Sequence, residues 1–357
     1  MTSINPIGIL AITVLLSLGF IGWGKFVLLA LDIKPKFGHE TPVGIQLIIG
    51  YCFFSSAGGY FCSLNIANSQ VLSLFAVIGV LILFFCLLKE HRLCNVKNFF
   101  FNLKNKILII VVTTISVILS MGDIALQRMN VTDDFPSYLY LAHRLNVTGG
   151  LIDSFNARRI LSENSFILIQ SIYLKFTGFY GIFAAEWCFA LGVLALLLFE
   201  FRKRMNRSVF VSCLAAISIF VGSGIGGESN LSPQFIVVLL LVSLYLLFGQ
   251  QFELNHGEVQ RASYVLIGLV FSTIFSLRPQ YLIGVALLLL LPLGRTLNVR
   301  IFLKNMFIVF LTFILSNLGW MLSLYRSNKT FFFQLFGTGG NLGYLKSGIT
   351  SSFGDFF

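Results

Sequence analysis

Acidic, basic and hydroxyl side chains gather in one stretch of a chain that is otherwise strongly apolar. Asp133 and Asp134 stand side by side there, and Tyr138 follows shortly after them. A carboxylate at a water boundary can act as a general base, and two that converge can bind a metal ion. Arg158 and Arg159 come later in the same stretch, and arginine suits phosphate because its planar fork donates two parallel hydrogen bonds.

Three further polar positions could contribute to the same chemistry. Glu228 lies in a glycine-rich turn, where it could bind a hydroxyl group or a metal ion. Glu186 lies inside an apolar run, where an ionisable group is expensive and is usually functional or paired. Arg278 precedes Pro279 in a very short polar turn and could bind a phosphate.

Most of these residues also have a plainer interpretation. One of Asp133 and Asp134 could cap a helix that starts near Pro136, while the other is solvated. The adjacent arginine pair could bind only anionic lipid, and Arg278 could extend to the headgroups. Glu228 could be an ordinary solvated loop acid. Whether these residues take part in chemistry or are simply capping and solvated groups therefore depends on the helices and loops that carry them.

The composition identifies the chain as a polytopic membrane protein. Of its 357 residues, 57% are hydrophobic and 11% are charged, whereas a soluble domain is roughly 45 to 50% apolar. Apolar runs near the ~20 residues needed to cross a bilayer recur along the chain, and lipid requires them to be helical. We expect an all-α transmembrane bundle with ten spans: 7–31, 43–64, 69–88, 107–126, 179–200, 208–222, 234–249, 262–277, 280–297 and 305–325.

The distribution of Lys and Arg orients these spans, because basic loops stay cytoplasmic. Fifteen of the 25 Lys and Arg residues lie in five alternate loops: 32–42, 89–106, 201–207, 250–261 and 295–304. These loops are predicted to be inside, which places the polar stretch and both termini outside a multi-pass plasma-membrane protein. The formal net charge of +11 is therefore mainly a topology signal, and we expect a lipid bilayer and no nucleic acid as partner.

The long outer segment 127–178 should contain structure of its own, because it exceeds the usual loop length. After Pro136, one set of side chains falls at helical spacing and predicts an amphipathic helix on the outer membrane face: Tyr138, Leu141, Ala142 and Leu145. Residues 165–177 are apolar but too short to span a bilayer. They either re-enter the membrane or join the next helix as one bent span.

An ordered series of side chains runs through this region: Asp134, Tyr138, Ala142, Thr148-Gly149, Arg158-Arg159 and Lys175-Phe176-Thr177-Gly178. The series resembles the first outer loop of the GT-C superfamily, polytopic glycosyltransferases that take sugars from polyprenyl-phosphate donors. The resemblance covers roughly 107–198. A later segment, Ser276-Leu277-Arg278-Pro279-Gln280, is similar to a basic motif of this superfamily that faces the lipid phosphate. The helix before the loop runs from inside to outside in the family and, by charge, in this chain as well.

The resemblance implies sugar transfer to a glycan, lipid or protein acceptor of the cell envelope. Asp134 matches the family's catalytic loop acid by its spacing to Tyr138. Phe135 replaces the usual Glu and Asp133 supplies a second acid one place early, so either aspartate is the expected base. The residues expected to bind the donor phosphate are Arg278, Arg158 and Arg159. Those expected to bind substrate are Tyr138, Glu228 and Glu186.

The resemblance also divides the chain into three regions. Residues 1–106 form an N-terminal addition of three helices that ends in a basic cytoplasmic loop. Residues 107–325 form the GT-C-like transmembrane module with its large outer loop. Residues 326–357 form a short extracytoplasmic tail, or the start of a segment that is cut off.

The donor is expected to be membrane-delivered, because no dinucleotide or phosphate-loop motif appears and nucleotide sugars are not available outside. No cofactor or metal ligand set is indicated, although a divalent metal could take part. The competing predictions are a transporter or flippase, a polysaccharide polymerase or ligase, and a scaffold without chemistry. A transporter is disfavoured because no repeat relates the two halves and the ionisable residues gather outside rather than midway. A polymerase would carry its large loop late in the chain, whereas this one is early.

Overall fold

Helices make up almost all of the described structure. The computed structural model describes residues 5–32, 41–91, 128–129, 138–151, 164–201, 228–229, 233–253, 261–277, 281 and 299–328. The predicted all-α class is confirmed for these residues, and a single pair of two-residue strands is the exception. An apolar chain in lipid has no water to bind its backbone groups, and a helix binds them internally.

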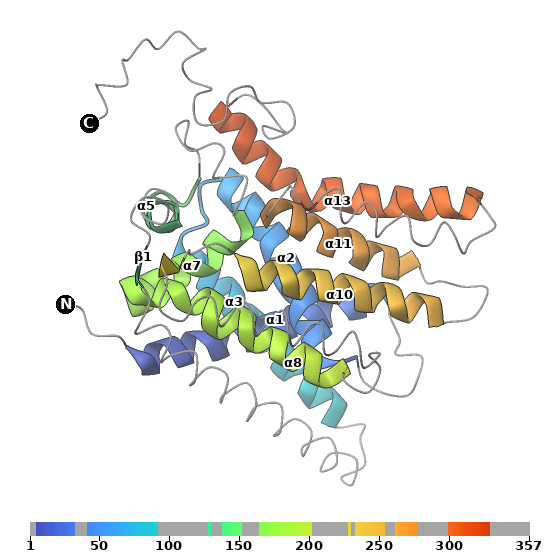
Figure 1. Ribbon diagram of the computed structural model, residues 1–357, viewed down its shortest axis with the longest axis horizontal. Coiled ribbons are helices and arrows are strands. Elements are labelled where there is room, and N and C mark those ends of the chain that lie inside the picture. Colours follow the sequence, from blue (N-terminus) through green and yellow to red (C-terminus); the bar gives the residue numbers. More distant parts are fainter. Residues whose placement is uncertain are drawn as a thin grey trace.

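The helices run side by side in a bundle (Figure 1). The N-terminal helices are α1 (Pro6–Ala30), α2 (Val43–Ser63) and α3 (Ser69–His91). The middle of the chain forms α5 (Tyr140–Thr148), α7 (Asn164–Thr177), the 3-10 helix η2 (Phe179–Phe183), the π-helix η3 (Ala185–Ala190) and α8 (Leu191–Phe201). The C-terminal helices are α10 (Gln234–Glu253), α11 (Arg261–Leu277) and α13 (Val299–Asn328), and the strands are β1 (Arg128–Met129) and β2 (Glu228–Ser229).

Five helices of the described part are long and apolar enough to cross a membrane: Pro6–Ala30, Val43–Ser63, Ser69–Lys89, Phe179–Leu198 and Phe302–Arg326. They coincide with five of the predicted spans, and this supports a bilayer environment. Two further predicted spans correspond to α10 and α11, whose apolar parts are shorter. The predicted spans 107–126, 208–222 and 280–297 lie outside the described residues, apart from Tyr281. The total of ten spans stays a prediction.

Close backbone contacts hold α1 against its neighbours. A Cβ atom added at Gly24 would overlap the carbonyl oxygen of Gln46 in α2, and one added at Gly22 would overlap that of Gly79 in α3. Glycine permits this approach because it has no side chain, which is the usual way in which helices associate in a membrane. The same helix is thus fixed to α2 on one side and to α3 on another.

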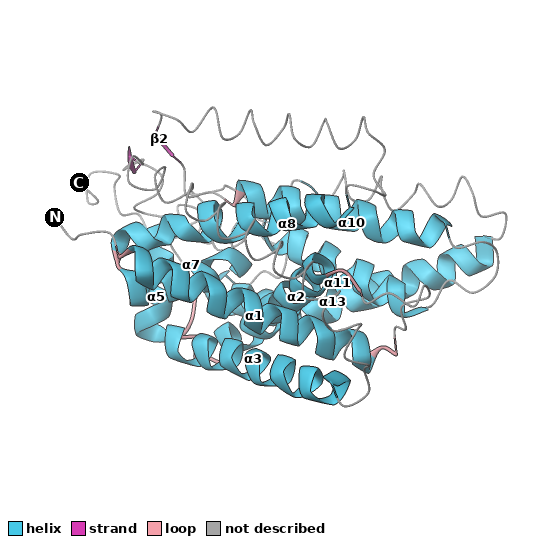
Figure 2. Cartoon of the chain, turned by 90° about the horizontal axis from the view of Figure 1, so that it is seen from below, coloured by secondary structure: helices cyan, strands magenta, loops and turns pink. Residues whose placement is uncertain are grey.

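The central helix of the bundle is α2, which contacts α1, α7, α8, α11 and α13. In contrast, α3 lies at one edge (Figure 2), and large apolar side chains on its outer side are exposed. Leu81 and Phe85, for example, are 61% and 69% exposed. This is the arrangement expected of a lipid-facing helix, because lipid and side chain are equally apolar.

The helices differ in direction relative to the end of the bundle at which α5 lies, here called the α5 end. Helices α1, α3, α8 and α10 begin toward it, and α2, α11 and α13 finish toward it (Figure 1). The parallel course of α11 and α13 is fixed by packing, since Gly268 lies against Val309 while Phe271 stacks on Phe313. The two ends that residues 278–298 connect therefore lie at opposite ends of the bundle.

Candidate functional site

Three buried hydroxyl groups meet where α7 begins and α11 ends. The Tyr51 hydroxyl lies 3.2 Å from Ser165 Oγ, and Ser276 Oγ lies 3.3 Å from the same atom. These residues are 1%, 0% and 3% exposed, respectively. The contact is therefore inside the bundle, and Tyr51 places it near the middle of the length of α2.

A buried carboxylate holds the start of α10 at the same place. Glu186, in the π-helix η3, is 5% exposed, and its Oε1 accepts a hydrogen bond from the backbone N–H of Phe235. The first N–H groups of a helix lack partners within it, and the positive end of the helix favours an anion. Trp187 packs edge-on against the Phe235 ring, with the ring centroids 5.4 Å apart. Phe189, in the same π-helix, contacts the ring of Tyr51.

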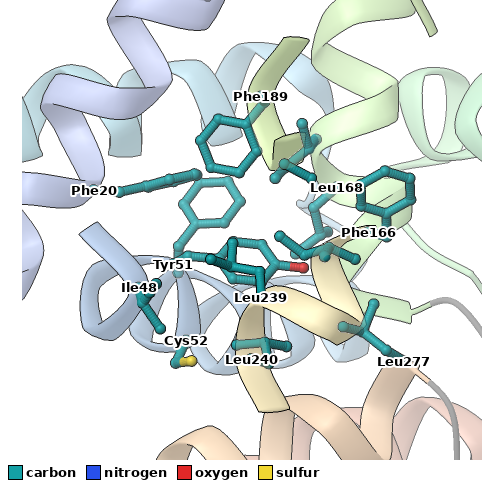
Figure 3. Close-up of a cluster of buried hydrophobic side chains, with 14 of the residues drawn as sticks. Phe20, Ile48, Tyr51, Cys52, Phe166, Leu168, Phe189, Leu239, Leu240 and Leu277 are labelled. Carbon is teal, nitrogen blue, oxygen red and sulfur yellow. The ribbon is translucent and has the colours of Figure 1, made fainter. Parts of the chain in front are cut away.

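We call this meeting place the helix-end junction and define it by five residues: Tyr51, Ser165, Glu186, Phe235 and Ser276. Apolar side chains surround its Tyr51 (Figure 3). The rings of Phe20 and Phe189 lie 5.4 Å apart, and each of them contacts the ring of Tyr51. Leu239 and Leu240 of α10 lie on another side. In such surroundings a polar group has to find its partner within the protein.

The predicted helix after Pro136 is present as α5, and its apolar face is buried. Leu141, Ala142 and Leu145 are fully buried, and Tyr138 just before the helix is 2% exposed. The buried face contacts α7, where Asn146 Nδ2 donates to the carbonyl oxygen of Ser171 at 3.0 Å. The predicted substrate-binding residue Tyr138 is therefore part of the protein core.

The end of α5 is fastened to the turn between α2 and α3. Gly149 ends the helix with φ +67°, a left-handed conformation that glycine adopts without strain. Its carbonyl oxygen accepts a hydrogen bond of 2.8 Å from the Ala67 N–H. A Cβ atom at Gly149 would overlap the Asn65 carbonyl oxygen. The N-terminal helices thus fix the position of α5.

The strands β1 and β2 join two polar segments that are far apart in the sequence. They pair in parallel, with Arg128 opposite Glu228 and Met129 opposite Ser229. The start of the outer segment 127–178 therefore lies beside the segment that carries Glu228. The pairing places the backbone of Glu228, and its side chain is not among those described.

Five of the predicted site residues lie outside the described residues: Asp133, Asp134, Arg158, Arg159 and Arg278. Their described neighbours are informative, however. Ser165 comes six residues after the arginine pair, and Ser276 comes two residues before Arg278. The structure brings these two serines into contact.

Sequence reasoning did not single out the hydroxyls of the junction. Ser165 and Ser276 each lie in a segment that the sequence had marked, as the start of the short apolar run and as the start of the basic motif. Nothing in the sequence pointed to Tyr51, because a single tyrosine in an apolar span is common. Glu186 was expected near the outer end of its helix, and the structure shows it bound to the backbone of α10.

The junction offers hydroxyl groups, one carboxylate and the starts of two helices. The start of a helix carries partial positive charge, which suits an anion, and Glu186 already occupies that of α10. Among the described residues, no three His, Cys, Asp or Glu side chains are grouped so that they could hold a metal ion. Comparison of the chain with protein-family models, with curated proteins and with solved structures found no match.

Proposed function

We propose that this protein is a membrane glycosyltransferase of GT-C-like architecture. It transfers a sugar from a polyprenyl-phosphate donor to a glycan, lipid or protein acceptor on the extracytoplasmic face of the plasma membrane. The observation that carries this proposal is the contact of 3.3 Å between Ser165 and Ser276. It joins the two segments that supply the basic residues expected at the donor phosphate.

Chain length limits how far those basic residues can be from the contact. An extended chain spans about 3.3 to 3.6 Å per residue, so the Cα of Arg278 lies within about 7 Å of that of Ser276. By the same measure, Arg159 lies within about 22 Å of Ser165. These upper limits are compatible with a single phosphate bound between the two segments.

The described residues on either side of the acids lie at the same end of the bundle. Asp133 and Asp134 lie between Met129, which pairs with β2, and Tyr138, which is buried beside α7. The chain between these anchors is short. This supports a position for the acids at the α5 end, near the Glu228 segment.

The directions of the helices support the proposed topology. Charge distribution predicts that the spans matching α1, α3, α8 and α10 start outside and that those matching α2, α11 and α13 finish outside. The described helices follow this alternation relative to the α5 end. Because residues 278–298 link opposite ends of the bundle, a span at 280–297 fits the geometry. The α5 end is accordingly the extracytoplasmic side of our proposal.

In the proposed reaction, Asp134 or Asp133 takes the proton from the acceptor hydroxyl. The hydroxyl oxygen attacks the anomeric carbon of the donor sugar while the bond to the lipid phosphate breaks, and the configuration inverts. Arg278, with one of the arginine pair, stabilises the negative charge that develops on the leaving phosphate. General base catalysis of this kind contributes roughly 10² to 10⁴ in rate.

The test is transfer from radiolabelled polyprenyl-phosphate sugars by the purified full-length protein in nanodiscs, with extracted envelope glycans and lipids as acceptors. Wild-type protein is expected to form labelled product, and a variant with both Asp133→Asn and Asp134→Asn is expected to lose it. Arg278→Ala should raise the KM for the donor. Arg300→Ala should not, because Arg300 lies at the start of α13, at the end of the bundle opposite the α5 end. Undiminished transfer by the double Asn variant would contradict the proposed base.

A second candidate function is transport of an envelope lipid, and one observation favours it. Helix α7 begins and α11 ends beside Tyr51 in the middle of α2, and α10 begins at Glu186 of the neighbouring π-helix. Helix ends inside a bundle are typical of transporters, whose half-helices point at the substrate. Proteoliposomes distinguish the two functions: a transporter moves labelled lipid between the leaflets without forming product, whereas the enzyme consumes the donor.

A further inference from the structure

The turn between α2 and α3 and the end of α5 carry exposed apolar side chains at one place. Leu64 and Ile66 of the turn are 67% and 43% exposed, and Val147 of α5 is 71% exposed. The hydrogen bond from the Ala67 N–H to the Gly149 carbonyl oxygen holds the turn against the end of α5. We call Leu64, Ile66 and Val147 the turn patch. Apolar side chains that gather at a surface mark contact with a membrane or with another protein.

The length of α3 gives the depth of this patch relative to a bilayer. The apolar span Ser69–Lys89 has 21 residues, which at 1.5 Å per residue cover about 30 Å, the thickness of the hydrocarbon core. With Lys89 at one boundary of the core, Ser69 lies at the other. A helix tilt of about 20° brings the preceding turn slightly deeper. The turn patch therefore lies where the acyl chains meet the headgroups.

Basic and aromatic side chains accompany the patch. Arg326, at the end of α13, donates a hydrogen bond to the carbonyl oxygen of Ser63, directly before Leu64. On the exposed side of α5, Arg144 Nη1 donates to the Tyr140 hydroxyl at 2.9 Å. Tyrosine is enriched at the membrane interface, and arginine keeps its stem in apolar surroundings while its charged end reaches the headgroups. The positive charges suit lipid phosphates.

The orientation of α5 agrees with a position in the interface. The helix lies across the direction of the other helices, at the end of the bundle (Figure 1 and Figure 2). It therefore runs along the membrane plane when α1, α2 and α3 cross the membrane. Its predicted apolar face packs against α7 and is closed to lipid. Contact with the leaflet then comes from the other side, through Val147.

We propose that the turn patch is inserted into the lipid leaflet at the α5 end, with Arg144 and Arg326 at the level of the lipid phosphates. The observations favour lipid over a protein partner, because the patch continues the lipid-facing surface of α3 and lies at the boundary that the length of α3 sets. The inference does not depend on sugar transfer. It places α5 at the depth where the phosphate of a lipid-linked substrate also lies.

The experiment adds one tryptophan at a time to the full-length protein in nanodiscs. The three native tryptophans, Trp23, Trp187 and Trp320, are at most 8% exposed. The signal of the added residue is thus the difference from wild-type protein. Nanodiscs are prepared with lipids that carry bromine either near the glycerol or near the chain ends, and each lipid quenches tryptophan at its own depth. Iodide in the buffer quenches tryptophan that faces water.

Leu64→Trp and Val147→Trp are expected to lose most fluorescence with bromine near the glycerol, less with bromine near the chain ends and little with iodide. Leu81→Trp is the matched control, because Leu81 is 61% exposed near the middle of the same span. It should lose most fluorescence with bromine near the chain ends. Ile66→Trp provides the same comparison where Leu64→Trp does not fold, as judged from its melting temperature.

Two results would overturn the inference. Quenching of the patch variants by iodide, without quenching by either brominated lipid, places the patch in water. Protection from iodide and from both lipids means that another protein, such as a second copy of the chain, covers the patch. Sugar transfer plays no part in these measurements, so either result leaves the proposed function as it stands.

Discussion

The glycine contacts of α1 and the helix-end junction are both buried, but different forces hold them. At Gly22 and Gly24 the helix backbones touch, and the contact depends on the absence of side chains. At the junction helices end beside one another, and directional hydrogen bonds that Ser165 and Glu186 accept hold them together. Van der Waals packing tolerates many small residues, whereas hydrogen bonds require particular donors and acceptors. The glycine contacts therefore hold whole helices together, whereas the junction fixes where particular helix ends lie relative to one another.

The largest effect is expected from a larger residue at the glycine contact. Gly22→Ala would force the Gly79 carbonyl away and should lower the free energy of unfolding by about 3 kcal/mol. The KM for the polyprenyl-phosphate donor in the folded fraction should stay at the wild-type value, since the junction is not touched. Denaturant titration in mixed micelles measures the first quantity and the transfer assay in nanodiscs the second.

Leu81→Ala is the control for this change, because Leu81 faces outward on α3. It should alter the free energy of unfolding by less than about 0.5 kcal/mol. Equal stability of the two variants would show that α1 is not held as closely as the backbone contacts indicate.

The next effect is expected from the carboxylate at the start of α10. Glu186→Ala leaves the buried Phe235 N–H without its acceptor and should destabilise the protein by about 2 kcal/mol. Glu186→Gln keeps an acceptor oxygen and loses only the charge, so about half that loss is expected. Hydrogen exchange at the Phe235 amide should accelerate in the first variant and much less in the second. Identical behaviour of both variants would argue against a hydrogen-bonding role.

A smaller effect is expected where α5 is fastened to the turn before α3. Gly149→Ala places a side chain at φ +67° against Asn65 and should cost about 1 to 2 kcal/mol. Val147→Ala, two residues earlier and exposed, is the matched control and should be neutral. The comparison is made by thermal unfolding of both variants. A neutral Gly149→Ala would mean that α5 is not anchored through this turn.

The smallest effect is expected at the surface that α2 and α13 share. The Tyr60 hydroxyl donates to the Leu315 carbonyl oxygen at 2.6 Å, at an exposed position. Tyr60→Phe should lower the free energy of unfolding by about 0.6 kcal/mol, the usual value for such a bond between helices in a membrane. A loss as large as that of Glu186→Ala would remove the contrast between the lipid-facing surface and the junction.

Much of the helical framework could be predicted from the sequence. The predicted span 43–64 corresponds to Val43–Ser63, and 262–277 lies within Arg261–Leu277. Hydropathy succeeds here because the length of an apolar run is set by the bilayer. It was less accurate for α13, which begins at Val299 instead of 305, because Arg300 and Lys304 lower the hydropathy of a segment that is still helical.

The interior of one span could not be predicted in this way. Residues 179–200 were expected to form one helical span, and the structure divides them into a 3-10 helix, a π-helix and an α-helix. Hydropathy does not distinguish these forms. The π-helix carries Glu186, and a local widening of this kind is frequent at functional sites.

The sequence by itself determined the class of this protein, the helices and the segments that carry acids and arginines, because these depend on local composition and period. Only the tertiary structure decided that Tyr51, Ser165 and Ser276 meet, that Glu186 binds the start of α10, and that Arg128 pairs with Glu228. Those contacts join residues that are up to 114 positions apart. Helix packing in three dimensions sets them, and no hydropathy pattern along a single chain records which helix faces which.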